Sequence, residues 1–365
     1  MKRLMAAGMM AGMLLGAACG GGARPAAVAP TAGDSPTAVA TAAPAAEERA
    51  ATITAVCDSA YLPAVLDLIN GAEERLTIVH FEFVYGTATR AVQEALGAAV
   101  RRGVTVTMVL DEESAKTQRS IGFLTELGVK AKLDGTETRT HTKLVVADGR
   151  RVLFGSTNFS TASMQLNHET NLLVDDARLG AAAEQYAAAL GRDATASVEL
   201  APAELTGLTV YFDRGFEQPL LALLAGARET IEVQMYGTRY YPRDPHSPST
   251  AVLQALADAA QRGVTVRVLL EQGEGGGEMT EQLNRETAAF LAAHGVTVRF
   301  DPREVISHAK LVLVDDRATV GSMNWGFGGF RQYHEMNSIV SDPAPVTALR
   351  AYFAGLWAAG EPYRP

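Results

Sequence analysis

The 365-residue sequence lacks three features that would point to common classes of protein. It has only two cysteines, Cys19 and Cys57, which excludes a small scaffold held together by several disulfides. Beyond the N-terminus it has no apolar run long enough to cross a membrane as a helix. It also lacks an excess of positive charge. Because the formal net charge is −9, no overall basic field attracts nucleic acid or anionic lipid, and any anion must be bound by a local cluster.

The first 50 residues differ in composition from the rest of the chain. A basic start and a short apolar stretch lead through small residues to Cys19, which is typical of a secretory signal and resembles the lipobox of bacterial lipoproteins. Gly16 stands where that motif usually has Leu, so plain signal-peptide cleavage is the alternative. We expect a signal peptide over 1–18, lipidation of Cys19, a flexible Ala/Pro/Gly linker over 19–50, and export to the periplasmic or extracellular side of the cell envelope.

The rest of the chain is an internal repeat. Asp58 aligns with Asp213 at an offset of 155 residues, two RGVTV segments follow at an offset of 160, and two His-containing motifs are 167 apart. The growing offset locates insertions in the second copy, at 239–248 and 271–282. Cys57 aligns with Phe212, so we expect a structural thiol there rather than a nucleophile. The two predicted halves are 51–200 and 201–365.

Each half alternates helical and strand patterns. Apolar residues recur at helical spacing in some segments, whereas others are short, rich in β-branched residues and bounded by turn residues. This alternation predicts an α/β sandwich built from two repeated halves, related by a pseudo-twofold axis, with the active site at their interface. Helices over 177–191 and 346–360 are expected to close the two halves.

The repeated motifs read HTKLVVADGRRVLFGSTN from His141 and HAKLVLVDDRATVGSMN from His308. Side chains two apart on a strand point to the same side, so His141 and Lys143 should reach one site, as should His308 and Lys310. Asp148 lies at odd separation from its histidine, in the turn that follows. We expect it, like Asp315 in the second copy, to face away and fix that turn.

Further polar residues recur beside each motif. Ser156 and Asn158, again two apart, offer a hydroxyl and an amide beside the lysine, as do Ser322 and Asn324. Two histidines facing each other across one phosphate could supply a nucleophile and a proton donor, and the lysines would neutralise phosphoryl oxygens. The recurring carboxylates, Glu169 and Glu335, could each accept a hydrogen bond from the far nitrogen of a histidine and fix its tautomer.

The paired pattern H-x-K-x4-D followed by G-S-x-N resembles the phospholipase D superfamily, the HKD phosphodiesterases. The match covers roughly 51–365. It implies a phosphohistidine intermediate, attack by water or an alcohol, and no metal or cofactor. It also implies that His141 is the nucleophile and His308 the general acid, although nothing in the sequence separates these two roles. The residues carried over are catalytic His141, Lys143, Asp148, His308, Lys310 and Asp315; phosphate-binding Ser156, Asn158, Ser322 and Asn324; and histidine-orienting Glu169 and Glu335.

Other polar or aromatic segments allow more than one interpretation. His168 and His334 adjoin the glutamates and favour a structural role, because neighbours on an extended chain point to opposite sides. His80 and Glu82 have no polar equivalents in the second copy and would either shape an asymmetric pocket or be buried as a pair. The GEGGGE stretch at 273–278 is typical of a surface loop or lid. The WGFGGF stretch at 325–330 would either grip acyl chains or bases, or pack in the core.

The reaction type is better defined than the substrate. A predicted lipid anchor, the acidic charge, and a pocket covered by the inserted loops and the Trp325 region favour a phospholipid at a membrane surface, with phosphatidylcholine hydrolysis to phosphatidic acid as the model reaction. An exported nuclease acting on DNA or RNA is the main alternative, and it would need a local basic groove. A lipoprotein that only binds phosphate groups is a third. Because one chain carries both motifs, we expect a monomer.

Overall fold

A computed structural model describes residues 51–112, 115–135, 138–273 and 277–365. The predicted signal peptide, the linker with Cys19, and part of the GEGGGE stretch lie outside these residues. The described residues belong to a single folded unit, 49–365. Within them, no helix combines the length and apolarity needed to cross a bilayer.

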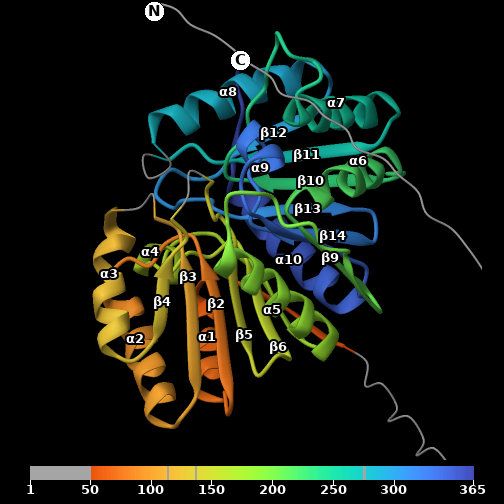
Figure 1. The fold of residues 1–365 in the computed structure, drawn as a ribbon. Coiled ribbons are helices and arrows are strands. Elements are labelled where there is room, and N and C mark those ends of the chain that lie inside the picture. Colours follow the sequence, from red (N-terminus) through yellow and green to blue (C-terminus); the bar gives the residue numbers. More distant parts are fainter. Residues whose placement is uncertain (1–50, 113–114, 136–137, 274–276) are drawn as a thin grey trace, which may run out of the picture. The chain divides into compact units, whose positions relative to one another are not determined.

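Two mixed sheets, one from each half of the chain, form the framework (Figure 1). The first sheet contains β1 (Thr52–Cys57), β2 (Arg75–His80), β3 (Thr105–Leu110), β4 (Lys130–Leu133), β5 (Lys143–Ala147), β6 (Arg151–Gly155) and β7 (Thr170–Asp175). The second contains β8 (Ala203–Leu205), β9 (Leu208–Phe212), β10 (Thr230–Met235), β11 (Thr265–Leu270), β12 (Thr297–Phe300), β13 (Lys310–Val314), β14 (Arg317–Gly321), β15 (Met336–Val340) and β16 (Glu361–Pro362).

The two sheets have the same internal order. The first runs β4-β3-β2-β5-β6-β7-β1, and the second runs β12-β11-β10-β13-β14-β15-β9 with the short strands β16 and β8 added at its edges. In both, the strand that carries the motif lysine, β5 or β13, pairs antiparallel with a strand of the parallel set. The predicted α/β sandwich of two repeated halves is therefore confirmed.

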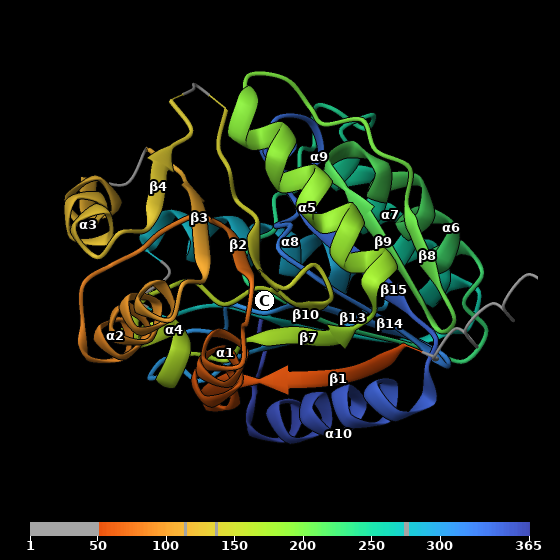
Figure 2. The ribbon, with the colours of Figure 1, turned by 60° about the horizontal axis from the view of Figure 1, so that its bottom comes forward.

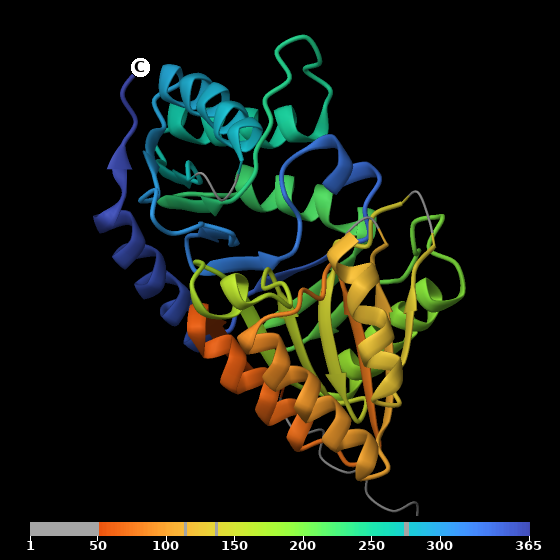
Figure 3. The same ribbon diagram turned by 90° about the vertical axis from the view of Figure 1, so that its left-hand side faces the viewer.

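Helices pack on both faces of each sheet. Those of the first half are α1 (Tyr61–Asn70), α2 (Thr87–Arg101), α3 (Ala115–Glu126), α4 (Thr161–Gln165) and α5 (Ala177–Arg192). Those of the second are α6 (Glu217–Ala225), α7 (Pro248–Gln261), α8 (Glu278–Ala293), α9 (Phe327–Arg331) and α10 (Pro343–Ala359). Figure 3 shows α1 beside α2, and their apolar sides bury Leu68 and Leu96 against strand residues such as Ile78. A glycine with positive φ follows each of α2 and α7, at Gly103 and Gly263, and allows the chain to turn into the next strand.

The inner faces of the two sheets share one apolar core, which joins the halves. Alternate residues of the same strands point inward, so Leu144 and Val146 of β5 meet this central core while Val145 faces the outer helices. The helices predicted over 177–191 and 346–360 correspond to α5 and α10, which bury Tyr186 and Phe353 in the central core. Figure 2 shows α10 lying along β1, a strand of the other half.

Candidate active site

The two motif histidines are held by backbone contacts that cross between the halves. Each lies two residues before its strand, in a short extended segment. The His141 N–H donates to the carbonyl of His334 at 3.0 Å, and the His308 N–H donates to the carbonyl of His168 at 2.8 Å. Isolated bridges, Thr140 with His334 and Ser307 with His168, continue the pairing. Each histidine is therefore fixed beside the glutamate of the opposite half.

The imidazoles pair with glutamates reciprocally. His141 Nδ1 lies 3.0 and 3.1 Å from the two carboxylate oxygens of Glu335, and His308 Nδ1 lies 3.0 Å from both oxygens of Glu169. With Nδ1–H donating to a carboxylate, Nε2 is the nitrogen left for chemistry. The sequence indicated that glutamates could orient histidines, but in the structure each partner comes from the other half.

The motif lysines are buried in the same charge cluster. Burial is the main cause that lowers the pKa of Lys143 to about 8, and burial likewise lowers that of Lys310 to about 7. Burial followed by the charges of both lysines holds the pKa of His141 well below its ordinary value, and both lysines also act on His308. Because each ammonium influences both imidazoles, the four side chains form one site. Each ammonium donates to the carbonyl of its own motif histidine, Lys143 to His141 and Lys310 to His308.

The predicted phosphate-binding residues divide into two kinds. The hydroxyl of Ser156 donates to Glu169 at 2.5 Å, and that of Ser322 donates to Glu335, so in this structure both serines hold the carboxylates. Within the described part of the chain, neither the Asn158 nor the Asn324 side-chain amide has a hydrogen-bond partner, and both carbonyl oxygens are buried. The predicted role in phosphate binding therefore rests on these two amides.

The motif aspartates lie away from the histidines. Asp148 accepts hydrogen bonds from the backbone N–H groups of Glu73, Glu74 and Arg75 at 2.8–3.0 Å, with φ of 53°. Asp315 does the same for 228–230, with φ of 47°. A strand rises about 3.3 Å per residue, so five residues separate Asp315 from Lys310 by about 16 Å. Both aspartates are thus bound to the turn backbone, which agrees with their expected role in fixing that turn.

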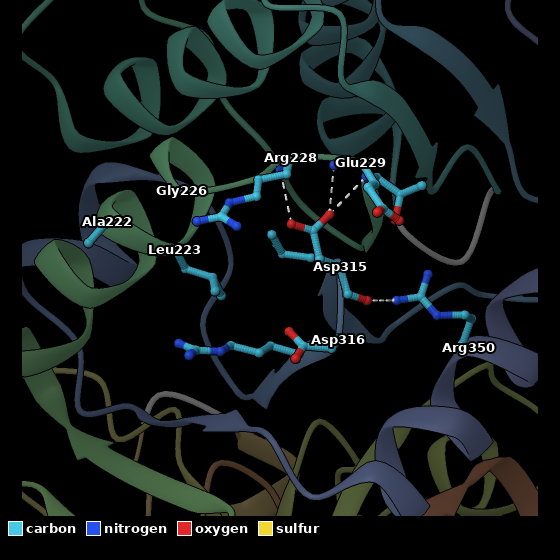
Figure 4. Close-up of a pocket in the computed structure, with 11 residues that line it drawn as sticks. Ala222, Leu223, Gly226, Arg228, Glu229, Asp315, Asp316 and Arg350 are labelled. Atoms are coloured by element: carbon cyan, nitrogen blue, oxygen red, sulfur yellow. Dashed lines mark hydrogen bonds between the residues drawn. The ribbon is translucent and has the colours of Figure 1, made fainter.

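A pocket of about 840 Å³ lies beside the Asp315 turn (Figure 4). Figure 4 shows the Asp315 carboxylate receiving the backbone N–H groups of Arg228 and Glu229, and the Arg350 guanidinium donating to the Asp315 carbonyl. Neither motif histidine lines this pocket. Its arginines are matched by carboxylates in the same lining, so it offers no net charge for an anion.

Two further pairs of residues support the site, although the sequence analysis did not assign them to it. The rings of Phe81 and Tyr236 lie edge-on to His141 and His308, with centroids 5.1 and 4.7 Å apart, and each has the motif lysine 4.9 Å from its centroid. A ring in this position fixes the imidazole plane and favours a nearby cation. The offset of 155 that aligns the halves also pairs Phe81 with Tyr236, and this was the available signal.

The second supporting pair, Asp58 and Asp213, marked the start of the repeat. Each adopts positive φ, 51° and 46°, and its carboxylate accepts the backbone N–H of a site glutamate. Asp58 binds the N–H of Glu169 at 2.8 Å and Asp213 that of Glu335 at 3.1 Å. Aspartate tolerates this backbone region better than most residues, which explains its recurrence at a sharp turn.

The histidines outside the two motifs have structural contacts. His168 and His334 bind Asp301 and Asp213 through Nδ1 at 2.6 and 2.8 Å, which fits the structural role. His80 is buried and stacks on Phe159 with centroids 3.9 Å apart.

Trp325 and Cys57 were also interpreted from the sequence. Trp325 is buried in the core of the second half, which agrees with the packing interpretation of its stretch, whereas Phe327 of the same stretch is exposed. Cys57 is half-buried, and burial raises the pKa of its thiol to about 12, which opposes nucleophilic chemistry.

The comparison that identifies the chain covers both halves. The family model described as "Cardiolipin synthase, PLD-like domain" matches residues 65–193 and 220–357. The chain belongs to this family. Cardiolipin synthase B of Escherichia coli (strain K12) is 29% identical over 333 residues, which cover 82% of this chain and 78% of that protein. A phospholipase D of Rickettsia bellii is 28% identical over 116 residues, 32% of this chain and 56% of that protein.

Solved structures agree on the fold. The crystal structure of phosphatidylserine synthase from Haemophilus influenzae matches with a TM-score of 0.66 at 12% identity, and covers 85% of this chain and 87% of that one. Polyphosphate kinase from Porphyromonas gingivalis matches with a TM-score of 0.60 at 14% identity, over 84% of this chain and 47% of that one. At these identities the likeness establishes the two-halved architecture alone.

Proposed function

We propose that this protein transfers the phosphatidyl group of a phospholipid to water or to an alcohol, without a metal, through a phosphohistidine intermediate. The observation that carries the proposal is the reciprocal pairing of two histidines with two glutamates around two buried lysines. Such a site offers two imidazoles in fixed tautomers and a concentrated positive charge for one phosphate group.

The reaction proceeds in two displacements. In the first, Nε2 of His141 forms a bond to phosphorus, the bond from phosphorus to the head-group oxygen breaks, and Nε2–H of His308 gives its proton to that oxygen. In the second, water or an alcohol gives its proton to Nε2 of His308, its oxygen bonds to phosphorus, and the bond from phosphorus to His141 breaks. Lys143, Lys310 and the two asparagine amides would neutralise and bind the phosphoryl oxygens as charge shifts among them.

The surroundings of the two histidines support this division of roles. Burial and then four neighbouring cationic groups all lower the pKa of His141, which favours a neutral nucleophile. Burial also lowers the pKa of His308, but the charge of Glu169 opposes it, so His308 holds its proton more readily. The same residue can therefore donate a proton first and accept one later.

A phospholipid is the substrate class that the relatives favour. Proteins named cardiolipin synthase B align along most of this chain, and their name concerns a phospholipid product. The net charge of −9 also disfavours nucleic acid, whose binding draws on positive surface charge. Phosphatidylglycerol and phosphatidylcholine are accordingly the first substrates to test, and a single chain, which holds both histidines, should be active as a monomer.

The test offers the purified full chain three substrates in the presence of EDTA: phosphatidylglycerol vesicles, phosphatidylcholine vesicles and single-stranded DNA. The His141→Ala variant is assayed in parallel. We expect phosphatidic acid or a transphosphatidylation product from at least one lipid with the wild type only, and phosphate label trapped on His141 after an alkaline quench, because a phosphohistidine is stable in base and labile in acid. DNA cleavage with both lipids intact would instead establish a nuclease, and loss of lipid activity in EDTA would refute metal independence.

We also propose that the chain is exported and anchored through a lipid on Cys19, which would bring the site to a membrane. The N-terminal pattern and the Ala/Pro-rich stretch after it support this arrangement. Labelling of cells with radioactive palmitate should mark the wild type but not a Cys19→Ser variant. Label in neither protein, together with a mature chain that begins at another residue, would establish plain signal cleavage.

A further inference from the structure

The two His–Glu pairs differ in the number of donors that hold the carboxylate. Glu169 accepts from Ser156 at 2.5 Å and from Ser163 at 2.7 Å, in addition to His308. Among the described side chains, only Ser322 and the imidazole of His141 bind the carboxylate of Glu335. The pseudo-twofold relation is therefore broken at one hydroxyl group.

The missing hydroxyl is explained by the neighbouring short helix. Ser163 follows Asn158 by five residues and precedes Glu169 by six, and Gly329 stands at the same position between Asn324 and Glu335. A Cβ atom at Gly329 would lie 2.4 Å from the Asn324 carbonyl oxygen, far inside van der Waals contact. The close approach of α9 to Asn324 thus excludes any side chain there.

Ser163 also has a second side-chain neighbour, which Gly329, without a side chain, does not have. The Asn167 amide lies 3.5 Å from the Ser163 oxygen, at the outer limit of a hydrogen bond, and it favours a serine that points its proton toward Glu169. The residue equivalent to Asn167 is Tyr333, whose ring instead lies 4.8 Å from the Arg139 guanidinium. One carboxylate is therefore bound by two serine hydroxyl groups and the other by one.

The two carboxylates respond differently to burial. Burial favours protonation of both, but at Glu169 the charges of His308 and Lys310 and the hydrogen bonds outweigh it, and the pKa lies below its ordinary value. At Glu335 burial prevails and raises the pKa to about 7. A charged carboxylate against His308 stabilises the imidazolium there, whereas a partly protonated one does less for His141.

We propose that Ser163 is a positioning residue that keeps Glu169 charged and turned toward His308, so that His308 rather than His141 carries the proton given to the leaving group. This inference rests on the function proposed above, because it assigns the origin of the division between nucleophile and acid. Ser163 itself does not reach the phosphate. It acts through Glu169.

The test compares Ser163→Ala, and Ser163→Cys as an isosteric second variant with a weak donor, with the wild type and with Thr161→Ala. Thr161 lies on the same helix, but its hydroxyl oxygen accepts a hydrogen bond from the Ala88 N–H and does not bind Glu169. Two readouts are taken on the full chain. One is the pH titration of the His308 imidazole by NMR, assigned with His308→Gln. The other compares the rate of phosphatidylglycerol cleavage with the rate of the p-nitrophenolate burst from phosphatidyl-p-nitrophenol, because this phenolate leaves without a proton.

We expect both Ser163 variants to lower the titration midpoint of His308 by roughly one pH unit and to slow phosphatidylglycerol cleavage roughly tenfold, with the p-nitrophenol burst nearly unchanged. Thr161→Ala should match the wild type. An unchanged His308 titration, or equal losses on both substrates, would overturn the proposal. If the wild type cleaves neither lipid while Ser163→Ala still shifts the His308 titration, the proposed function fails and the positioning role stands.

Discussion

Replacing Lys310 by methionine should remove activity and yet stabilise the fold. The side chain is 3% exposed, and burial is the main cause that lowers its pKa from 10.5 to about 7. At about 1.4 kcal/mol per pH unit, the fall from 10.5 to about 7 corresponds to roughly 5 kcal/mol of unfavourable free energy for the charged form. Methionine keeps the unbranched stem, but it loses the hydrogen bond to the His308 carbonyl, which is worth about 2 kcal/mol. We expect a net gain of about 3 kcal/mol at pH 6.

The pH dependence identifies the cause. The folded pKa of Lys310, about 7, lies below the unfolded value of 10.5. Between these values the unfolded chain keeps a proton that the folded chain has lost, so the free energy of unfolding of the wild type rises with pH across this window. The methionine variant has no such group. Its advantage should therefore be largest below pH 7, and should have disappeared by about pH 10.

Urea unfolding followed by circular dichroism at several pH values between 6 and 10 measures this difference directly. The control is Lys130→Met, at an exposed position of β4, which should leave stability and activity close to those of the wild type. A Lys310→Met protein that is less stable at pH 6, or a stability difference that does not change with pH, would refute the argument that the buried ammonium strains the fold. Retained phospholipid cleavage would refute its role at the phosphate.

Three further predictions concern the same cluster. Glu335→Gln should lower kcat about a hundredfold with little change in thermal stability, because an amide cannot hold the His141 tautomer by charge. Steady-state kinetics and a melting curve check this. A fall in melting temperature that accompanies the loss of kcat would show a purely structural role. Asp315→Ala should lower the free energy of unfolding by about 3 kcal/mol, since three backbone N–H groups and a positive φ depend on it, and urea unfolding beside an unchanged kcat checks this. Sulfate should bind more weakly as pH rises above 7–8, because its binding requires protonated Lys143 and Lys310; calorimetry in buffers of different ionisation enthalpy should detect proton uptake, and pH-independent binding would count against it.

Much of the fold could be predicted from the sequence because the repeat doubles every signal. Helices over 177–191 and 346–360 appear as α5 and α10 within three residues at their ends, since their apolar spacing and flanking turn residues are local properties. The odd spacing of Asp148 from His141 also predicted correctly that the aspartate faces away from the histidine. The two interpretations of the WGFGGF stretch could not be separated from the sequence, because an aromatic residue beside a motif carries no local sign of whether it packs inward, as Trp325 does, or stays exposed, as Phe327 does.

The sequence by itself determined which chemical groups this protein brings together: two histidines, two lysines, two asparagines and two glutamates, each in a fixed spacing that strand geometry converts into a shared side. Only the tertiary structure decided which glutamate binds which histidine. Backbone pairing between halves carries each histidine to the other half's glutamate. Within each half, the serine hydroxyl donates to the carboxylate of that glutamate. The approach of α9 to Asn324 then removes one hydroxyl from one pair. The histidine–glutamate contacts join residues more than a hundred positions apart, and their geometry depends on how two sheets pack, which no local spacing encodes.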